Sequence, residues 1–283
     1  MHIMFGQIIL GLIAFALAML YEGIDRKIHA RMQNRRGPSI FQPFFDFAKL
    51  IKKEIIIPRW SNKNLLLLSP IFAIAALLLI FTIVLTQESV NIIILVYFLL
   101  LSAAFTIIMG FSVISPFMSI GAIREILLVV SCEIPIILSL IAVAVKQSSL
   151  YIQPGVFILA LPFSGLAFLL SILGKSSRTP FDIPEAETEI VAGYATELSG
   201  ILLGFARIFS NLKIPVLISV FVTFFLGRPD SMLIYISEIF FLSFVVTIIR
   251  TITARLRIDQ ALKFFIFIAI PLAMIDVIRA SMP

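Results

Sequence analysis

Long apolar stretches, separated by shorter polar segments, dominate the hydropathy pattern of the chain. These stretches lack the two-residue alternation of membrane β-strands, and each approaches the ~20 residues with which a helix crosses a ~30 Å hydrocarbon core. Because backbone groups in hydrocarbon must find hydrogen-bond partners within their own segment, the pattern favours helices. We therefore predict an all-α, polytopic membrane protein of about eight transmembrane helices. The predicted spans lie near 3–22, 65–86, 91–111, 123–145, 155–174, 201–226, 232–251 and 260–279.

The segment around residues 40–55 is predicted to be an additional, amphipathic helix at the membrane surface. Its apolar positions follow helical spacing, Pro43 suits a first turn, and Pro58 ends the run. The apolar stripe comprises Phe41, Phe44, Phe45, Ala48, Ile51 and Ile55, and the polar stripe comprises Gln42, Asp46, Lys49 and Lys53. Two interpretations remain open: a lipid-facing anchor, or a docking surface for a cytoplasmic partner.

The sequence shows no fixed-period repeat and no low-complexity linker, so residues 1–283 are expected to form a single membrane domain. The first apolar stretch has no small-residue cleavage site and is expected to remain as a span. Composition agrees, with 60% hydrophobic and 13% charged residues. The mean hydropathy is +1.12.

The net charge of +6 reflects membrane orientation and not nucleic-acid binding. If the N-terminus lies outside, the loops at 23–64, 112–124, 175–200 and 250–259 are cytoplasmic and hold most Lys and Arg residues, with Lys175 counted among them. The opposite loops hold Lys146, Arg228 and Arg279. This asymmetry predicts a multi-pass protein of the cell membrane with its main basic loops in the cytoplasm.

Cofactor chemistry within the chain is not expected. Cys132 is the one cysteine, and His2 and His29 are the two histidines, which is too few for an iron–sulfur cluster or a zinc site. Phosphate-binding loops and Ser/His/Asp arrangements are also lacking. We therefore predict no metal site and no catalytic residues, and place any redox chemistry on a partner.

Glu133 is the clearest candidate for function, because a carboxylate within a span costs on the order of 2.5–3.5 kcal/mol. It lies ten residues into its predicted span, which is roughly 15 Å and near mid-bilayer. Glu125 is about 80° round the same helix at its cytoplasmic end. Pro135 is expected to kink the helix and free carbonyl groups that could hold water. A neutral, structural Glu133 is the alternative.

A second group of acids occupies the predicted cytoplasmic loop and helix at 175–200. Asp182 and Glu185 fit a capping box, with Pro184 in the first turn, so a structural role accounts for both. That role does not account for Glu187, Glu189 and Glu197. On one helix, Glu185, Glu189 and Glu197 would share a broad face, and their like charges would raise one another's pKa toward proton exchange near neutrality.

Several single charges are expected to be structural. These are Glu22, Glu238, Asp259, Lys263 and Asp276, and Asp259 is expected to pair with Lys263 four residues later.

Two stretches resemble the complex I subunit-H family. The first holds Asp25-Arg-Lys, Arg31-Met-Gln-Asn-Arg-Arg-Gly-Pro38, Gln42-Pro, Asp46, Lys49-Leu and Lys53-Glu54. The second is Arg178-Thr-Pro-Phe-Asp-Ile-Pro-Glu-Ala-Glu-Thr-Glu-Ile-Val-Ala-Gly-Tyr194, with Glu197 and Ser199-Gly200. Shorter agreement occurs at Ile120-Gly-Ala-Ile-Arg124, Glu133-Ile-Pro135 and Arg255-Leu-Arg-Ile-Asp-Gln260.

The resemblance implies a protein that joins a peripheral redox arm to a membrane arm and begins an ion path. It implies that Glu133, Glu125, Asp182, Glu185, Glu187, Glu189 and Glu197 contribute to that path. It also implies that the arginine-rich first loop meets the peripheral arm. The expected docking residues are Arg26, Arg31, Arg35, Arg36 and Arg178.

Between Gly37-Pro38 and Gln42-Pro43 the chain has a short connection, whereas quinone-reducing members usually carry a glycine-containing insert. Tyr194-Ala-Thr-Glu-Leu-Ser also lacks the second aromatic residue usual after the glutamate. The short loop resembles energy-converting, membrane-bound nickel–iron (NiFe) hydrogenases and related sulfur-reducing complexes, which take electrons from ferredoxin. The resemblance implies peripheral large and small subunits that carry the NiFe centre and iron–sulfur clusters, and further membrane subunits, including antiporter-like ones.

Other functions remain as alternatives. A quinone-chamber subunit of a complex I-like oxidoreductase, or the equivalent subunit of a sulfur reductase, belongs to the same superfamily. A free-standing secondary transporter would predict internal repeats with paired broken helices, which the sequence lacks. A purely structural scaffold would not explain why Glu133 lies within a membrane span.

Overall fold

Apolar helices form most of the computed structural model, which describes residues 2–86, 89–229 and 231–282. Six described helices are long and apolar enough to cross a membrane. They are α3 (Lys63–Thr86), α4 (Ile92–Phe111), α5 (Pro116–Gln147), α8 (Gly200–Phe221) extended by the π-helical turn η2 (Val222–Leu226), α9 (Met232–Ile252), and a last span made of α10 (Ile258–Phe264), the π-helical turn η3 (Phe265–Ala269) and α11 (Ile270–Ser281).

The other two predicted spans differ from expectation. Helix α1 (His2–Met32) covers the first span but continues ten residues beyond position 22, so its polar end reaches the first loop. In place of a helix over 155–174, the chain forms α6 (Pro162–Lys175), whose 14 residues extend about 21 Å and cannot cross a ~30 Å core alone. The all-α membrane fold is confirmed, and eight spans is an approximate count.

A two-stranded antiparallel sheet joins the segment before α4 to the segment after α5. Strand β1 (Val90–Asn91) pairs with β2 (Tyr151–Ile152), with Val90 opposite Ile152. The sheet ties the start of α4 to the segment between α5 and α6.

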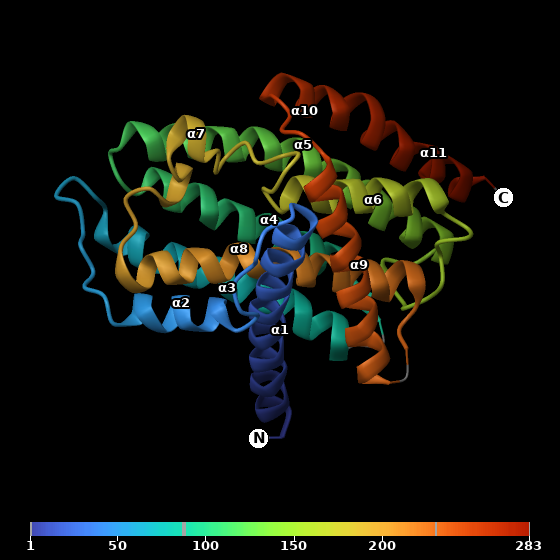
Figure 1. Cartoon of the computed structure of the whole chain (residues 1–283). Coiled ribbons are helices and arrows are strands. Elements are labelled where there is room, and N and C mark those ends of the chain that lie inside the picture. Colours follow the sequence, from blue (N-terminus) through green and yellow to red (C-terminus); the bar gives the residue numbers. More distant parts are fainter. Residues whose placement is uncertain (1, 87–88, 230, 283) are drawn as a thin grey trace.

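Helix α8 occupies the centre of the molecule, where it packs against α3, α1, α2 and α9 (Figure 1). Its span is almost wholly buried, whereas α9 and the last span bury about a quarter of theirs. At its far end Phe221 and Phe225 stack at 5.1 Å between ring centroids, and Phe168 of α6 packs against both. The most enclosed helix is therefore also the one that contacts the surface helix α2.

The predicted surface helix is confirmed as α2 (Gln42–Ile51), with Pro43 in its first turn (Figure 1). Its inner face packs on α1, where the ring centroids of Phe44 and Phe47 lie 6.4 and 5.9 Å from that of Phe15. Gly204 lets α2 approach α8 closely, because a Cβ at this position would lie 3.2 Å from the Phe47 ring. The outer face leaves Phe41 and Phe45 exposed.

The predicted acidic helix is mostly loop. It contains only the four-residue α7 (Glu187–Ile190) and the 3-10 turn η1 (Gly193–Ala195). No helix begins at the residues directly after Asp182, so the capping-box prediction is wrong: the chain turns at Pro184 and Glu185, and Asp182 forms an ion pair with Arg255. Gly193 has φ +54°, and a Cβ there would lie 1.8 Å from the Pro184 carbonyl oxygen, so the loop folds tightly back on itself.

Candidate functional site: a charged cavity and the buried ion pairs beside it

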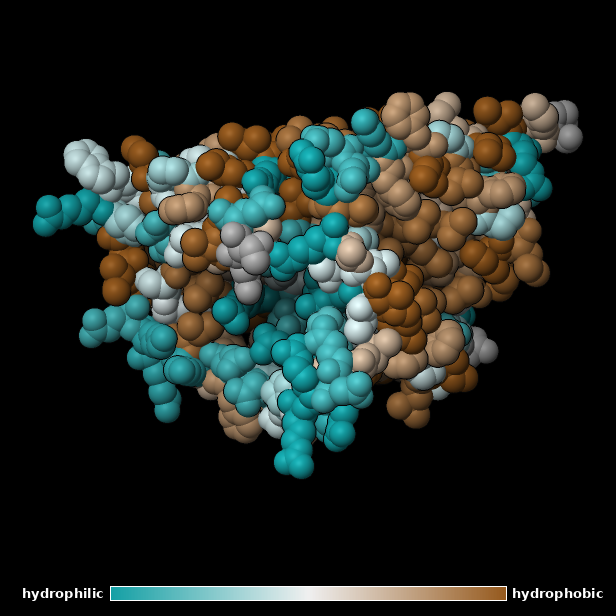
Figure 2. Space-filling model, turned by 45° about the horizontal axis from the view of Figure 1, so that its top comes forward, coloured by the Kyte–Doolittle hydropathy of each residue, from teal (hydrophilic) through white to brown (hydrophobic). Residues whose placement is uncertain are grey.

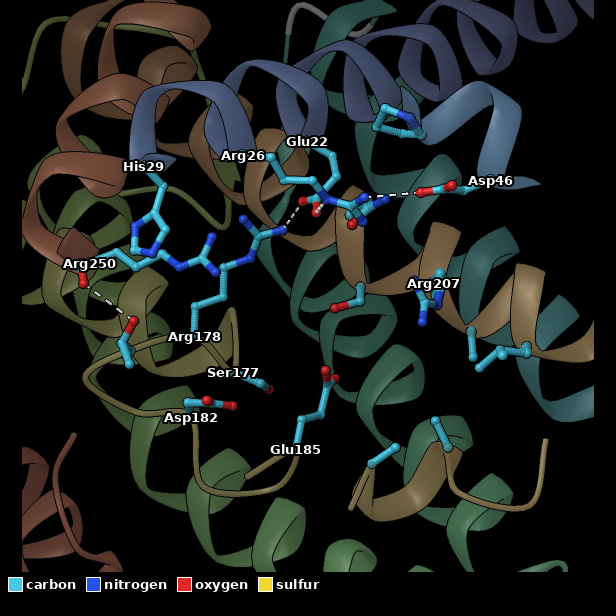
Figure 3. A pocket seen from close by; sticks show the side chains of 18 of the residues that line it. Glu22, Arg26, His29, Asp46, Ser177, Arg178, Asp182, Glu185, Arg207 and Arg250 are labelled. Atoms are coloured by element: carbon cyan, nitrogen blue, oxygen red, sulfur yellow. Dashed lines mark hydrogen bonds and ion pairs between the residues drawn. The ribbon is translucent and has the colours of Figure 1, made fainter. Parts of the chain in front are cut away.

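A cavity of about 560 Å³ opens between α1, α2, α8 and the acidic loop. On the face that holds it, hydrophilic side chains gather around a hollow, and hydrophobic side chains cover the neighbouring region (Figure 2). Figure 3 shows Glu22, Arg26 and Asp46 on one wall, Asp182 and Glu185 on the loop opposite, and Arg207 on a third side. Charged groups from α1, α2, α8, α9 and the acidic loop therefore meet in one solvent-open space.

The wall formed by α1 is held by a network of ion pairs around Asp25. The Asp25 carboxylate is fully buried and accepts hydrogen bonds from Arg178 at 2.5 Å, from Arg250 and from the Thr247 hydroxyl at 2.7 Å. Arg178 also pairs with Glu22. The network ties α1 and α9 to the start of the acidic loop.

Arg178 was expected to face a partner, and its position does not support that role. Its side chain is 11% exposed and is occupied by Glu22 and Asp25. Arg26 pairs with Glu22 at 2.6 Å and with Asp46 of α2 at 3.0 Å, so it stabilises the cavity wall. Of the predicted docking residues, Arg31, Arg35 and Arg36 are exposed.

Two of the loop acids, Asp182 and Glu185, line the cavity. Asp182 pairs with Arg255 at 2.8 Å. Glu185 accepts a hydrogen bond from the Tyr194 hydroxyl at 2.5 Å. Burial raises the pKa of the Glu185 carboxyl, although Lys213 and the Tyr194 hydroxyl oppose the shift. Glu185 therefore retains its proton to a higher pH than an ordinary glutamate.

The remaining loop acids point to different places. Glu189 pairs with Arg124 at 2.5 Å and is 60% exposed, and Glu197 accepts a hydrogen bond from Ser115 at 3.1 Å. The side chain of Glu187 lies outside the described part of the structure. The predicted helix face shared by Glu185, Glu189 and Glu197 is wrong, because the chain between them turns twice.

Ser177 connects the cavity to the first ion pair inside the membrane domain. It lines the cavity, and its hydroxyl lies 3.3 Å from Glu125 Oε2 and 3.4 Å from Lys213 Nζ. Lys213 of α8 and Glu125 of α5 are 3.1 Å apart, and both side chains are almost completely buried.

Glu133, two turns further along α5 and about 12 Å from Glu125, forms the second buried pair. Its partner is Lys175, the last residue of α6, which also donates a hydrogen bond to the Leu99 carbonyl oxygen at 3.2 Å. Glu133 lies, as predicted, within a helix long enough to span a membrane, and its side chain is buried inside the molecule. The placement of Lys175 in a cytoplasmic loop is wrong, since α6 ends inside the molecule and points this lysine at α5.

The single charges have mixed outcomes. Glu22 is paired, and Asp276 is fully buried, accepting from the Ser164 amide at the start of α6 at 2.8 Å and from Arg279 at 3.1 Å. Asp259 approaches Arg257 at 3.5 Å, and not the expected Lys263.

Three cations of the site were not predicted from the sequence. Lys213 and Arg207 were not singled out, and Lys175 was not expected to point inward. Lys213 and Arg207 lie within the predicted span 201–226, where a basic residue is itself a sign of an internal polar site. Within the described ranges, no group of three His, Cys, Asp or Glu residues could hold a metal ion.

The fold and the site define a polytopic, helical membrane subunit with a charged cavity next to intramembrane ion pairs. The sequence profile of the NADH dehydrogenase family matches residues 6–281, and the chain belongs to this family.

Relatives carry two kinds of name. The chain is 28% identical to the H subunit of NADH-quinone oxidoreductase from Dehalococcoides mccartyi (strain ATCC BAA-2266 / KCTC 15142 / 195), over 98% of this chain and 85% of the relative. It is 35% identical to hydrogenase-4 component C of Escherichia coli (strain K12), over 78% of this chain and 75% of the relative.

The fold is similar to a chain in the structure of the membrane-bound sulfane sulfur reductase, an archaeal respiratory membrane complex. The TM-score is 0.87 at 23% identity, and the match covers 99% of this chain and 100% of the other.

Proposed function

We propose that the chain is the membrane-anchor and coupling subunit of a ferredoxin-dependent, energy-converting hydrogenase-type complex. It docks a peripheral redox module at the cavity and begins the proton or ion path. The observation that carries this proposal is the polar connection from the cavity through Ser177 to Glu125 and Lys213, followed by Glu133 and Lys175.

Buried lysine–glutamate pairs suit coupling because each charge depends on its partner. Removing one partner from such a pair is strongly unfavourable in a low-dielectric interior. A proton delivered to Glu125 would neutralise its carboxylate and leave the charge of Lys213 uncompensated. This change would alter the electrostatic potential at the next pair, Glu133 and Lys175. Glu185, at the cavity wall, is the acid placed to hand over that proton.

The docking surface is assigned to the exposed arginines after α1. Arg31, Arg35 and Arg36 are exposed at the end of α1 and in the following loop. Arg35 and Arg36 line a smaller pocket that shares Arg26, His29 and Arg250 with the cavity. Arginine guanidinium groups bind carboxylates with a planar pair of hydrogen bonds, so an acidic patch on the peripheral module is the expected partner. NiFe and iron–sulfur centres are assigned to that module.

The hydrogenase branch is favoured by the similarity to hydrogenase-4 component C and by the short connection between Pro38 and Gln42. The fold is also similar, over its full length, to a chain of a membrane-bound sulfane sulfur reductase. A quinone-chamber subunit is the second candidate, supported by the NADH-quinone oxidoreductase relative, whose match covers 98% of this chain.

The experiment is to purify the native complex through an affinity tag on this chain and identify its subunits by mass spectrometry. We expect hydrogenase-like large and small subunits, and hydrogen evolution from reduced ferredoxin. A complex that reduces a quinone analogue, is blocked by a quinone-site inhibitor and evolves no hydrogen would contradict the hydrogenase assignment. Sulfide production from a sulfane substrate would replace it by a sulfur reductase.

A further inference from the structure

Glu238 is a membrane-embedded carboxylate without a partner in the described part of the chain. It lies in α9, and its Oε2 atom is buried without a hydrogen bond. The described ion pairs account for the other acids expected to be structural, Glu22, Asp259 and Asp276, but not for Glu238. Among these four acids, Glu238 is therefore the one without a described ion pair.

Helix α9 places Glu238 at the edge of its outward face, where the side chain is half-buried and its Oε2 atom is enclosed by the chain. Tyr235, Ile239 and Thr247 point inward and are buried, whereas Ile234 and Phe241 are exposed, and Phe241 is 66% exposed. Residues 234, 238 and 241 follow i, i+4, i+7 spacing, so they form one stripe along the helix. Helix α9 lies at the outside of the bundle, with about a quarter of its span buried, and it packs against α1 and α8 (Figure 1). The stripe is thus an apolar surface with one carboxylate in it.

The depth of Glu238 within the span makes a charged carboxylate at this position unfavourable in free energy. The 21 residues of α9 extend about 31 Å, which matches a ~30 Å hydrocarbon core. Glu238 lies six residues from Met232, or about 9 Å inside that core. Hydrocarbon chains donate no hydrogen bonds, so lipid on this face would leave the carboxylate unsatisfied.

We propose that the outer face of α9 is covered by a transmembrane helix of a neighbouring membrane subunit, which presents a lysine or arginine to Glu238. The charge decides the kind of partner: a carboxylate in an apolar stripe needs a cation, and the stripe supplies apolar packing around the pair. This surface lies on a different helix from the docking arginines after α1. The inference rests on the proposed function only in requiring a multi-subunit membrane complex.

The first test places a photo-activated benzophenone amino acid at position 241 in the intact complex within its native membrane. We expect a crosslink to one membrane subunit whose sequence carries a basic residue within a span. The same group at Leu233, about 140° round the helix from Glu238, is the control and should give a different product. Crosslinks to lipid alone from position 241 would overturn the proposal.

The second test compares Glu238→Leu with Glu238→Gln. We expect the leucine variant to retain the crosslinked subunit about tenfold less well during detergent washing, a change of about 1.4 kcal/mol, with the glutamine variant between it and the native chain. Dicyclohexylcarbodiimide, which labels protonated carboxyls in apolar surroundings, should leave Glu238 unmodified in the complex. Labelling of Glu238 together with unchanged subunit retention in the leucine variant would show a neutral, lipid-facing acid and overturn the proposal.

These outcomes are separable from failure of the proposed function. If the chain purifies with partners of any redox type, the crosslink and retention tests still decide the role of Glu238. If it purifies alone from native membranes, the requirement for a complex fails, and this inference fails with it.

Discussion

Lys175, the last residue of α6, forms an ion pair with Glu133 of α5, and the two side chains are 3% and 5% exposed. The pair joins a helix too short to cross the membrane to the middle of the longest helix. Neither charge has enough water around it to remain alone. The pair therefore both holds α6 in place and makes Glu133 sensitive to the charge of its neighbours.

The first prediction concerns Lys175→Met, which removes the cation and leaves Glu133 unpaired. Loss of one member of a buried pair should lower the free energy of unfolding by about 3–5 kcal/mol. Thermal unfolding of the detergent-solubilised complex measures the loss. The double variant Lys175→Met with Glu133→Gln should recover much of it, and a double variant as unstable as the single one would contradict the pairing.

The second prediction concerns Ser177→Ala, which removes the hydroxyl between the cavity and Glu125. A hydrogen bond is worth about 1 kcal/mol, so ion transport should slow about fivefold while assembly is kept. Ser176→Ala is the matched control, because the Ser176 hydroxyl donates to the Leu173 carbonyl within its own helix end. Equal transport rates in the two variants would contradict a role for Ser177 in the path.

The third prediction follows from the raised pKa of Glu185. Below its usual value of 4.5 the carboxyl is protonated in both the folded and the unfolded chain. As the pH rises above that value, the unfolded chain loses this proton first, so the native protein progressively loses stability through Glu185. The glutamine in Glu185→Gln does not titrate, so this variant lacks the pH-dependent loss of stability.

The stability of Glu185→Gln relative to the native chain should therefore increase as the pH is raised from 4.5 toward the folded-state pKa. Melting curves of both proteins across this range measure the difference. A difference that is constant with pH, or that falls, would mean that the folded-state pKa of Glu185 is not raised.

The fourth prediction concerns the tight fold of the acidic loop. Gly193→Ala places a Cβ against the Pro184 carbonyl oxygen at a residue with positive φ, so it should destabilise the loop by more than about 1 kcal/mol. Limited proteolysis should then cut between residues 179 and 199 faster than in the native chain. Gly11→Ala, at a helical glycine with open space around it, should leave that cleavage unchanged or slower.

The sequence predicts the membrane fold well because its strongest signal, long apolar stretches, reports directly on burial in hydrocarbon. The surface helix α2 was also predictable, since its helical spacing and Pro43 act locally. The short helix α6 was not. Apolar residues at 155–161 suit either a span or an apolar loop, and hydropathy does not distinguish the two.

The site was harder to predict because its geometry depends on contacts distant in sequence. Asp182 and Glu185 have the local pattern of a capping box, but the ion pair with Arg255 and the hydrogen bond from Tyr194 place them in a loop. Glu133 was identifiable from its depth alone. Its partner was not, because Lys175 follows an apolar stretch just as a cytoplasmic lysine does.

The most direct test of the account measures ions transported per electron in Glu133→Gln, in the purified complex reconstituted into liposomes and driven by reduced ferredoxin. Glu54→Gln, at an exposed acid, is the control. We expect about tenfold fewer ions transported per electron, or fewer still, in the Glu133 variant alone. Native ion transport per electron in Glu133→Gln would contradict the claim that the ion path begins at these buried pairs.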